Sequence, residues 1–302
     1  MLFRLIALDY LISFNDAERV ETMNKHKLPT YFLSHGGGPW PWLKEEMPFY
    51  NELEHSLQAI PEQLGVLPKA ILMISGHWEN FEFSVMSNPH PPMVYDYSGF
   101  PEKTYHVKYP AAGAPELAAK VQKLIQTAGF SANLDDKRGF DHGTFAPLYA
   151  MYPQANVPVI QLSLRSDYDP DAHFKVGSAL APLREEGVLI IGSGLSFHNM
   201  RAFRTPEMAG PASRQFDEWL QKTLIHSTPE QRLKNLLHWA QAPSARLAHP
   251  QEDHLIPLMV VVGAAEDEVG ELNYHEENFM GGITASSFSF GQTAKTKAGV
   301  PV

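Results

Sequence analysis

Three histidines of the sequence follow apolar stretches that end in small residues. His35 closes the stretch PTYFLSH, His77 follows the apolar run of AILMISGHWEN, and His198 follows that of GVLIIGSGLSFH. Apolar runs of four to eight residues that end in a turn signal are typical of strands buried on both faces, as in a parallel sheet. Open parallel sheets bind their ligands just beyond the carboxyl ends of the strands. We therefore expect these three histidines to meet at one site. In a chain with 14 histidines and no cysteine, imidazole is the natural metal ligand.

Two further histidines have surroundings that suit such a site. His142 lies between Asp141 and Gly143, so the carboxylate of Asp141 is expected to orient its imidazole. His254 is expected on the inward face of a helix at residues 250–263, together with Leu258. A buried imidazole requires a partner, and a metal ion is one of the few good ones.

Other metal and catalytic patterns receive less support. Glu79 follows His77 by two residues, as in the His-x-Asp/Glu half of a 2-His-1-carboxylate iron site. Those oxygenases usually have double-stranded β-helices, whereas this chain alternates strands with helices. The zinc-protease signature His-Glu-x-x-His is absent, because phenylalanine stands four residues after His275. Residues 192–195, GSGL, lack the Gly-x-Ser-x-Gly spacing of a serine nucleophile.

The elements that must position these histidines alternate along the chain. Apolar runs and alternating patterns predict strands at residues 29–35, 70–77, 81–86, 157–164, 187–194 and 283–290. Helical spacing predicts helices at residues 49–64, 115–128, 170–183, 211–225, 229–240 and 250–263, and another that begins near residue 145. The expected fold is a single α/β domain with a mostly parallel central sheet flanked by helices, and with the metal site at the carboxyl ends of the strands.

One segment between these elements is unusually long. Residues 88–110 are rich in proline and tyrosine and contain Tyr95, Tyr97, Phe100 and Tyr105. Loops of this length in a compact domain are usually functional, as lids or binding rims. We expect this segment to form the rim of an apolar pocket.

Composition excludes several classes of function. The net charge of −10 argues against nucleic acid or anionic membranes as partners, and the lack of cysteine excludes disulfides and thiolate catalysis. Residues 1–14 are apolar but interrupted by Arg4 and Asp9, and are too short to span a bilayer. We predict an N-terminal extension at residues 1–22, a catalytic domain at residues 23–302 and a cytoplasmic location; the sequence predicts no particular oligomeric state.

Seven short motifs make the chain resemble a known family. They are LSHG, SGHW, GFP with YPAAG, FDHG, VIQLSL, SGLSFHN and HLIPL, and they run in family order from about residue 28 to residue 290. The sequence is similar to the class III extradiol ring-cleavage dioxygenases, in the DOPA 4,5-dioxygenase-like (LigB-type) branch. The resemblance implies that such an enzyme opens a catechol-type ring with O₂.

The resemblance also implies a role for each histidine. His35 and His77 match the paired metal-binding histidines of the family, and His254 matches the third ligand, where related class III enzymes have glutamate. His198 matches a residue that is a fourth ligand in resting zinc-bound forms and an acid–base residue in other members. His142 matches a second catalytic histidine near the substrate.

The resemblance further implies one divalent metal per chain. Fe(II) would support the dioxygenase reaction on a DOPA-like catechol, and Zn(II) is expected in resting or purified protein, because zinc binds such ligands more tightly. Two alternatives on the same fold are a zinc-dependent hydrolase and a catalytically silent zinc-binding protein.

Overall fold

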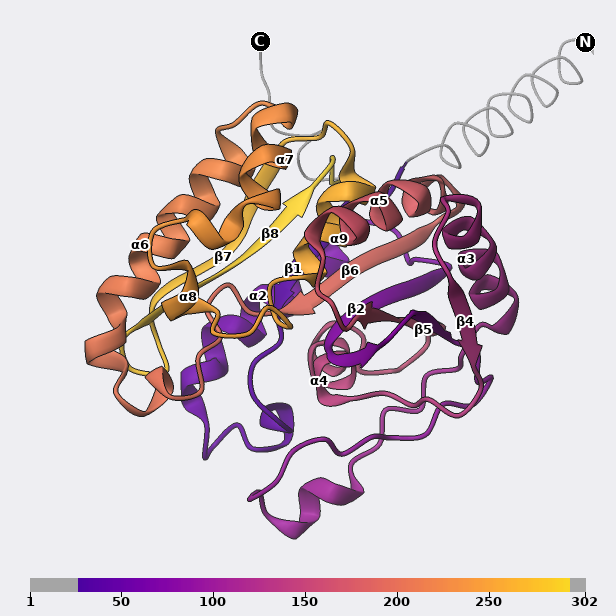
Figure 1. Cartoon of the computed structure of the whole chain (residues 1–302). Helices are drawn as coiled ribbons and strands as arrows, with labels where there is room; N and C mark the ends of the chain where they lie inside the picture. The colour runs from indigo at the N-terminus through magenta and orange to yellow at the C-terminus, as the bar shows by residue number, and fades with distance from the viewer. Residues whose placement is uncertain (1–26, 294–302) are drawn as a thin grey trace, which may run out of the picture.

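The apolar runs of the sequence form the centre of an eight-stranded sheet in the computed structural model, which describes residues 27–293 (Figure 1). The strands lie in the order β4-β3-β5-β2-β6-β1-β8-β7. Their bounds are β1 Thr30–Ser34, β2 Ala70–Asn80, β3 Phe83–Met86, β4 Ala132–Asp135, β5 Val159–Arg165, β6 Val188–Gly194, β7 Gly270–Phe279 and β8 Ile283–Phe290.

The four central strands run parallel. β2 pairs in parallel with β5 on one side and with β6 on the other, and β6 pairs in parallel with β1. Antiparallel pairing occurs where β8 joins β1, where β7 joins β8 and where β3 joins β5. The predicted fold class, a single α/β domain with a mostly parallel sheet, is therefore confirmed.

Helices cover both faces of this sheet (Figure 1). α3, α5 and α9 pack together on one face, α2 and α4 contact each other on the opposite face, and α6 covers the hairpin of β7 and β8. The helix bounds are α2 Asn51–Leu64, α3 Pro115–Thr127, α4 His142–Met151, α5 Pro170–Leu180, α6 Pro206–Ile225, α7 Pro229–Leu237, α8 Ala245–Ala248 and α9 Pro257–Ala265.

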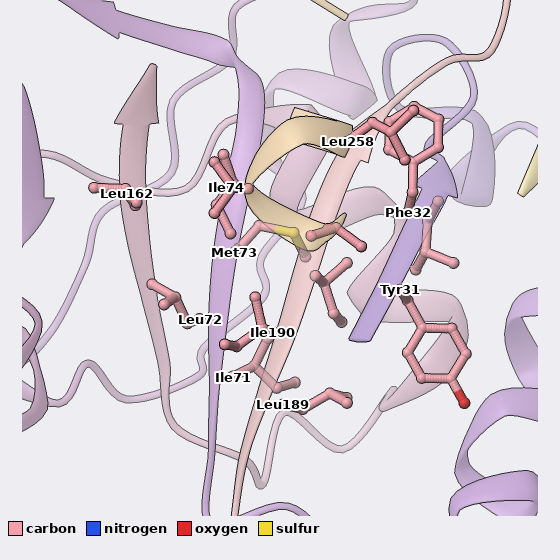
Figure 2. Packing of buried hydrophobic residues seen from close by; sticks show 14 of the residues in the cluster. Tyr31, Phe32, Ile71, Leu72, Met73, Ile74, Leu162, Leu189, Ile190 and Leu258 are labelled. Atoms are coloured by element: carbon pink, nitrogen blue, oxygen red, sulfur yellow. The ribbon is translucent and has the colours of Figure 1, made fainter. Parts of the chain in front are cut away.

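The core lies between the central strands and α9. All nine residues of α9 are buried, and the helix packs against β6 and β1. Figure 2 shows Leu258 of α9 beside the ring of Phe32 from β1. These side chains are fully buried. The apolar runs that lead to the candidate histidines therefore lie in the close-packed core.

Several sequence-based boundaries are wrong in detail. Residues 250–256 form turns, and the helix begins only at Pro257, so His254 precedes α9 rather than lying on it. β2 continues to Asn80, so His77 lies within the strand. The edge strands β4 and β7 were not predicted, because β4 has only four residues and most side chains of β7 are polar and not buried. The predicted extension at residues 1–22 lies outside the described residues. Within residues 27–293, no helix is both long enough and apolar enough to span a bilayer.

Candidate metal centre

Five histidines line one cavity at the carboxyl ends of the parallel strands. The cavity has a volume of about 520 Å³, and it contains all the site residues expected from the sequence, namely His35, His77, His142, His198 and His254. His35 directly follows β1, His77 lies in β2, and His142 is the first residue of α4. The other two come from the loop after β6 and the turn before α9.

Three of these imidazoles converge on one point. One ring nitrogen from each of His35, His77 and His254 lies within 4.8 Å of the other two. Nε2 of His254 is 3.1 Å from Nε2 of His77. Nε2 of His35 is buried and has no hydrogen-bond partner. A buried polar atom without a partner is rare in folded proteins and points to a missing ligand.

The opposite nitrogen of each ring faces an acceptor. Nδ1 of His35 is 2.6 Å from the carbonyl oxygen of Gly36, and Nδ1 of His254 is 2.8 Å from Oδ2 of Asp253. Nδ1 of His77 is 3.2 Å from Oδ2 of Asp96. Carbonyl and carboxylate oxygens only accept hydrogen bonds, so these contacts assign the ring protons to Nδ1. The three Nε2 lone pairs then face one another with no donor between them.

Burial keeps these rings neutral. It lowers the pKa of His35 and of His254 well below the usual range, and the neighbouring histidines lower both pKa values further. Burial, followed by the charge of His142, lowers the pKa of His77 to about 4. At neutral pH the lone pairs are therefore free of protons. A divalent cation fits this arrangement, because neutral imidazoles held through Nδ1 by carboxylates or carbonyls are common ligands of zinc and iron.

Small residues at the strand ends allow the ligand-bearing segments to approach closely. A Cβ atom on Gly194, the last residue of β6, would lie 2.1 Å from the carbonyl oxygen of His254. The carbonyl of Gly194 accepts from the backbone N–H of His35 at 3.1 Å. The carbonyl of His254 accepts from the N–H of Leu195 at 3.2 Å. The glycine that ends β6 therefore holds two of the three imidazole segments together.

His142 lies beside this group and is oriented by Asp96. Oδ1 of Asp96 accepts from Nδ1 of His142 at 2.8 Å and from its backbone N–H at 3.1 Å. Burial alone would raise the pKa of Asp96, but the hydrogen bonds from His142 and the charges of His142 and His77 together outweigh burial, so the pKa is lowered. Asp96 therefore carries a negative charge between the rings of His142 and His77. This arrangement leaves Nε2 of His142 as its proton acceptor.

The expectation that Asp141 orients His142 is wrong. Asp141 instead caps α4, where Oδ1 accepts from the N–H of Thr144 at 3.1 Å and from the hydroxyl of Ser75 at 2.7 Å. Its Oδ2 bonds Gln161 at 2.8 Å and Arg138 at 2.5 Å. Asp141 is adjacent to His142 in the chain, but its side chain points away because it must satisfy the first turn of the helix.

The ring of His198 stacks on the ring of His254, and His198 is not a member of the three-imidazole group. Their ring centroids are 3.4 Å apart and the planes differ by 12°. One ring nitrogen of His198 lies within 4.8 Å of ligand atoms of Asp253 and His254. Burial, together with the charges of His249 and His77, lowers the pKa of His198 to about 3. His198 is thus a neutral group at the cavity wall.

Glu79 does not complete a carboxylate site with His77. It is exposed and accepts a hydrogen bond from the hydroxyl of Tyr168. Among residues 27–293 it belongs to none of the groups of three side chains that could hold a metal. The 2-His-1-carboxylate interpretation built on Glu79 therefore has no structural support.

The loop at residues 88–110 forms part of the cavity wall, as expected. Tyr97 and Phe100 line the cavity, whereas the rings of Tyr95 and Tyr105 pack against Tyr97 from outside the lining. Asp96 comes from the same loop and was missed in the sequence, because no spacing links it to His77 or His142. Asp253 was visible only as an acidic neighbour of His254.

Replacing Asp96 by asparagine is expected to weaken metal binding by about 10–100-fold and to lower kcat. The two rings face different oxygens of Asp96, and asparagine replaces one of these oxygens with an NH2 donor, which cannot accept from an Nδ1–H. Competition with a chromogenic chelator measures the affinity. Asp136→Asn, which changes an exposed carboxylate outside the cavity lining, is the matched control. Unchanged affinity and kcat in Asp96→Asn would mean that Asp96 does not position the two rings.

Comparisons with known proteins agree with this geometry. The family model described as the catalytic LigB subunit of aromatic ring-opening dioxygenase matches residues 29–291. The chain is 42% identical to a 4,5-DOPA dioxygenase extradiol of Beta vulgaris, over 87% of this chain and 97% of that protein. It is 35% identical to the dioxygenase tasH of Hapsidospora irregularis, over 84% and 82% of the two chains. A crystal structure of an uncharacterized protein from Escherichia coli K12 superposes with a TM-score of 0.70 at 29% identity, over 87% of this chain and 100% of that one.

Proposed function

Because the chain belongs to the LigB family of aromatic ring-opening dioxygenases, we propose that its cavity binds a catechol and O₂ around one divalent metal held by His35, His77 and His254. The chain is an extradiol ring-opening dioxygenase. The alternatives, a zinc hydrolase or a catalytically silent zinc-binding protein, are not favoured by the family and its relatives. The observation that carries the metal assignment is the convergence of three Nε2 lone pairs without a donor.

The proposed resident metal is Fe(II). Iron bound there would supply the electron transfer between catechol and O₂, whereas zinc has no redox chemistry. Zinc binds imidazole ligands more tightly than Fe(II), so we expect it in protein purified without added iron. Three protein ligands leave positions open for the two adjacent oxygens of a catechol.

His142 is the proposed general base. Asp96 holds Nδ1–H, so Nε2 is free to take a proton from a catechol hydroxyl. The negative charge of Asp96 would then stabilise the imidazolium that forms. The centroid of the His142 ring is 4.0 Å from that of His77, and this closeness supports a base beside the proposed metal.

His198 keeps two proposed roles, a fourth metal ligand or a second acid–base group. It lines the cavity and stacks on His254. The metal content of a His198→Ala variant separates them, because loss of a ligand lowers metal affinity and loss of an acid–base group does not. The cytoplasmic location and the lack of nucleic-acid or membrane partners stay predictions.

Anaerobic reconstitution with Fe(II) tests the proposed function. Addition of a catechol in air-saturated buffer is expected to give O₂ uptake and a yellow ring-opened product in equal amounts. DOPA is a suitable first substrate, since relatives in Beta vulgaris and Portulaca grandiflora are named 4,5-DOPA dioxygenase extradiol. The Zn(II)-loaded protein serves as the control and should not consume O₂. Hydrolysis of an ester or amide by the zinc form, with no catechol turned over by the iron form, would contradict the proposal.

A further inference from the structure

The charged side chains that line the cavity, histidines aside, are carboxylates. Asp96 and Asp253 are the two acidic groups, and no lysine or arginine of the described chain lines the cavity. The chain as a whole carries a net charge of −10. The side chains that line the cavity therefore offer a ring substituent no lysine or arginine partner.

A set of apolar side chains makes up much of the remaining wall. It is formed by Met47, Phe100, Met200, Phe203, Phe279 and Met280. Tyr97 adds a ring, and its hydroxyl is already committed to the carbonyl oxygen of Thr104 at 2.6 Å. Methionine and phenylalanine side chains on several sides form a surface that binds alkyl or aryl groups and adapts to their shape.

The basic side chains near the cavity lie outside its lining. Arg138 donates to the backbone carbonyl of His77 at 3.3 Å and is paired with Asp141. Lys103 is exposed and its ammonium is 3.4 Å from Glu46, another exposed residue. Arg201 and Arg204 follow Met200 and Phe203 in the chain but do not line the cavity. A carboxylate carried into the cavity by a substrate would lose water without gaining a lysine or arginine partner among the lining side chains.

From this distribution, and resting on the proposed function, we infer that the enzyme selects catechols whose ring substituent is apolar and carries no carboxylate. The metal held by the histidines would bind the two catechol oxygens. The methionine and phenylalanine side chains of the wall would contact the ring substituent. Discrimination against acidic catechols comes from the absence of a paired cation, in the same way that other sites reject a group that they would leave unpaired.

Three catechols with the same three-carbon side chain test the inference on the Fe(II)-loaded enzyme. They are 4-propylcatechol, which is neutral, 3-(3,4-dihydroxyphenyl)propionate, which is an anion, and DOPA, which is a zwitterion. We expect kcat/KM for 4-propylcatechol to exceed that for the propionate by at least roughly tenfold, with DOPA below 4-propylcatechol. Equal or higher kcat/KM for the propionate or for DOPA would overturn the inference while leaving the dioxygenase activity intact.

Binding of the same three catechols to the Zn(II)-loaded protein allows their affinities to be compared without turnover. Calorimetric Kd values are expected to follow the same order, tightest for 4-propylcatechol, and the reverse order would contradict the inference. If no catechol is turned over by the iron form, the proposed function fails, whereas the order of Kd values still tests the preference for an uncharged substituent.

A substitution can also introduce a cationic side chain into the cavity lining. Met200 lines the cavity and is 66% exposed, so Met200→Arg should fold normally. We expect it to raise kcat/KM for the propionate relative to 4-propylcatechol by up to roughly fivefold, an effect that added salt reduces. Met200→Gln, which changes polarity without charge, is the matched control and should give no such gain. An equal ratio in both variants would contradict the position assigned to the substituent.

Discussion

Replacing His77 by alanine is expected to abolish stable metal binding and catechol cleavage while leaving the chain folded. The ring centroid of His77 is 5.0 Å from that of His35 and 4.7 Å from that of His254, and its Nε2 is 3.1 Å from Nε2 of His254. Loss of a residue that only orients a ligand typically costs 10–100-fold in metal affinity, so loss of the ligand itself should cost more than about 100-fold. The side chain is partly exposed in the cavity, so its removal leaves no large void in the core.

Metal content by mass spectrometry and O₂ uptake after Fe(II) reconstitution measure these effects, and circular dichroism checks the fold. His106→Ala is the matched control, because His106 is exposed, pairs with Glu102 within one helical turn and lies outside the cavity lining. It should bind metal and turn over catechol like the unmodified chain. A His77→Ala protein that keeps its metal and its activity would refute the ligand assignment.

Replacing His142 by alanine is expected to leave the metal content unchanged but to lower kcat by roughly 10²–10⁴-fold. His142 is not a member of the three-imidazole group, and its Nδ1 is hydrogen-bonded to Asp96. Its removal takes away the proposed proton acceptor without removing a ligand of that group. Steady-state kinetics on the Fe(II)-loaded variant, together with its metal content, measure both quantities.

The dependence of kcat/KM on pH distinguishes a base from a merely structural residue. Without its base, the variant should cleave catechols faster as pH rises and the substrate hydroxyl ionises by itself, whereas the unmodified enzyme should depend less on pH in that range. Retention of full activity in His142→Ala, with an unchanged pH profile, would leave His142 only a structural role.

The central strands could be predicted from the sequence because their burial requires a continuous run of apolar residues, which is visible within each strand's own sequence. Strands buried on both faces must be continuously apolar, so β1, β2, β5 and β6 were visible as short apolar runs. The bounds of β8 were predicted exactly as residues 283–290, since this strand alternates in sequence. The position of ligands at the carboxyl ends of parallel strands then followed from topology, which placed His35 and His77 in the same cavity.

The parts that could not be predicted depend on contacts between distant segments. Asp96 reaches His142 across 46 residues of sequence, and no local pattern records that contact. β7 is mostly polar and is a strand only because it pairs with β8 at the edge of the sheet. Asp141 was assigned to the wrong partner because adjacency in sequence says little about direction once a helix begins at the next residue.

Anomalous diffraction from crystals loaded anaerobically with Fe(II) tests the central claim, that His35, His77 and His254 hold one metal, most directly. A single iron peak is expected within about 2.0–2.3 Å of Nε2 of each of these three histidines. A peak bound by His198 and Asp253 and away from His35, or crystals of active enzyme without iron at the three Nε2 atoms, would contradict the account.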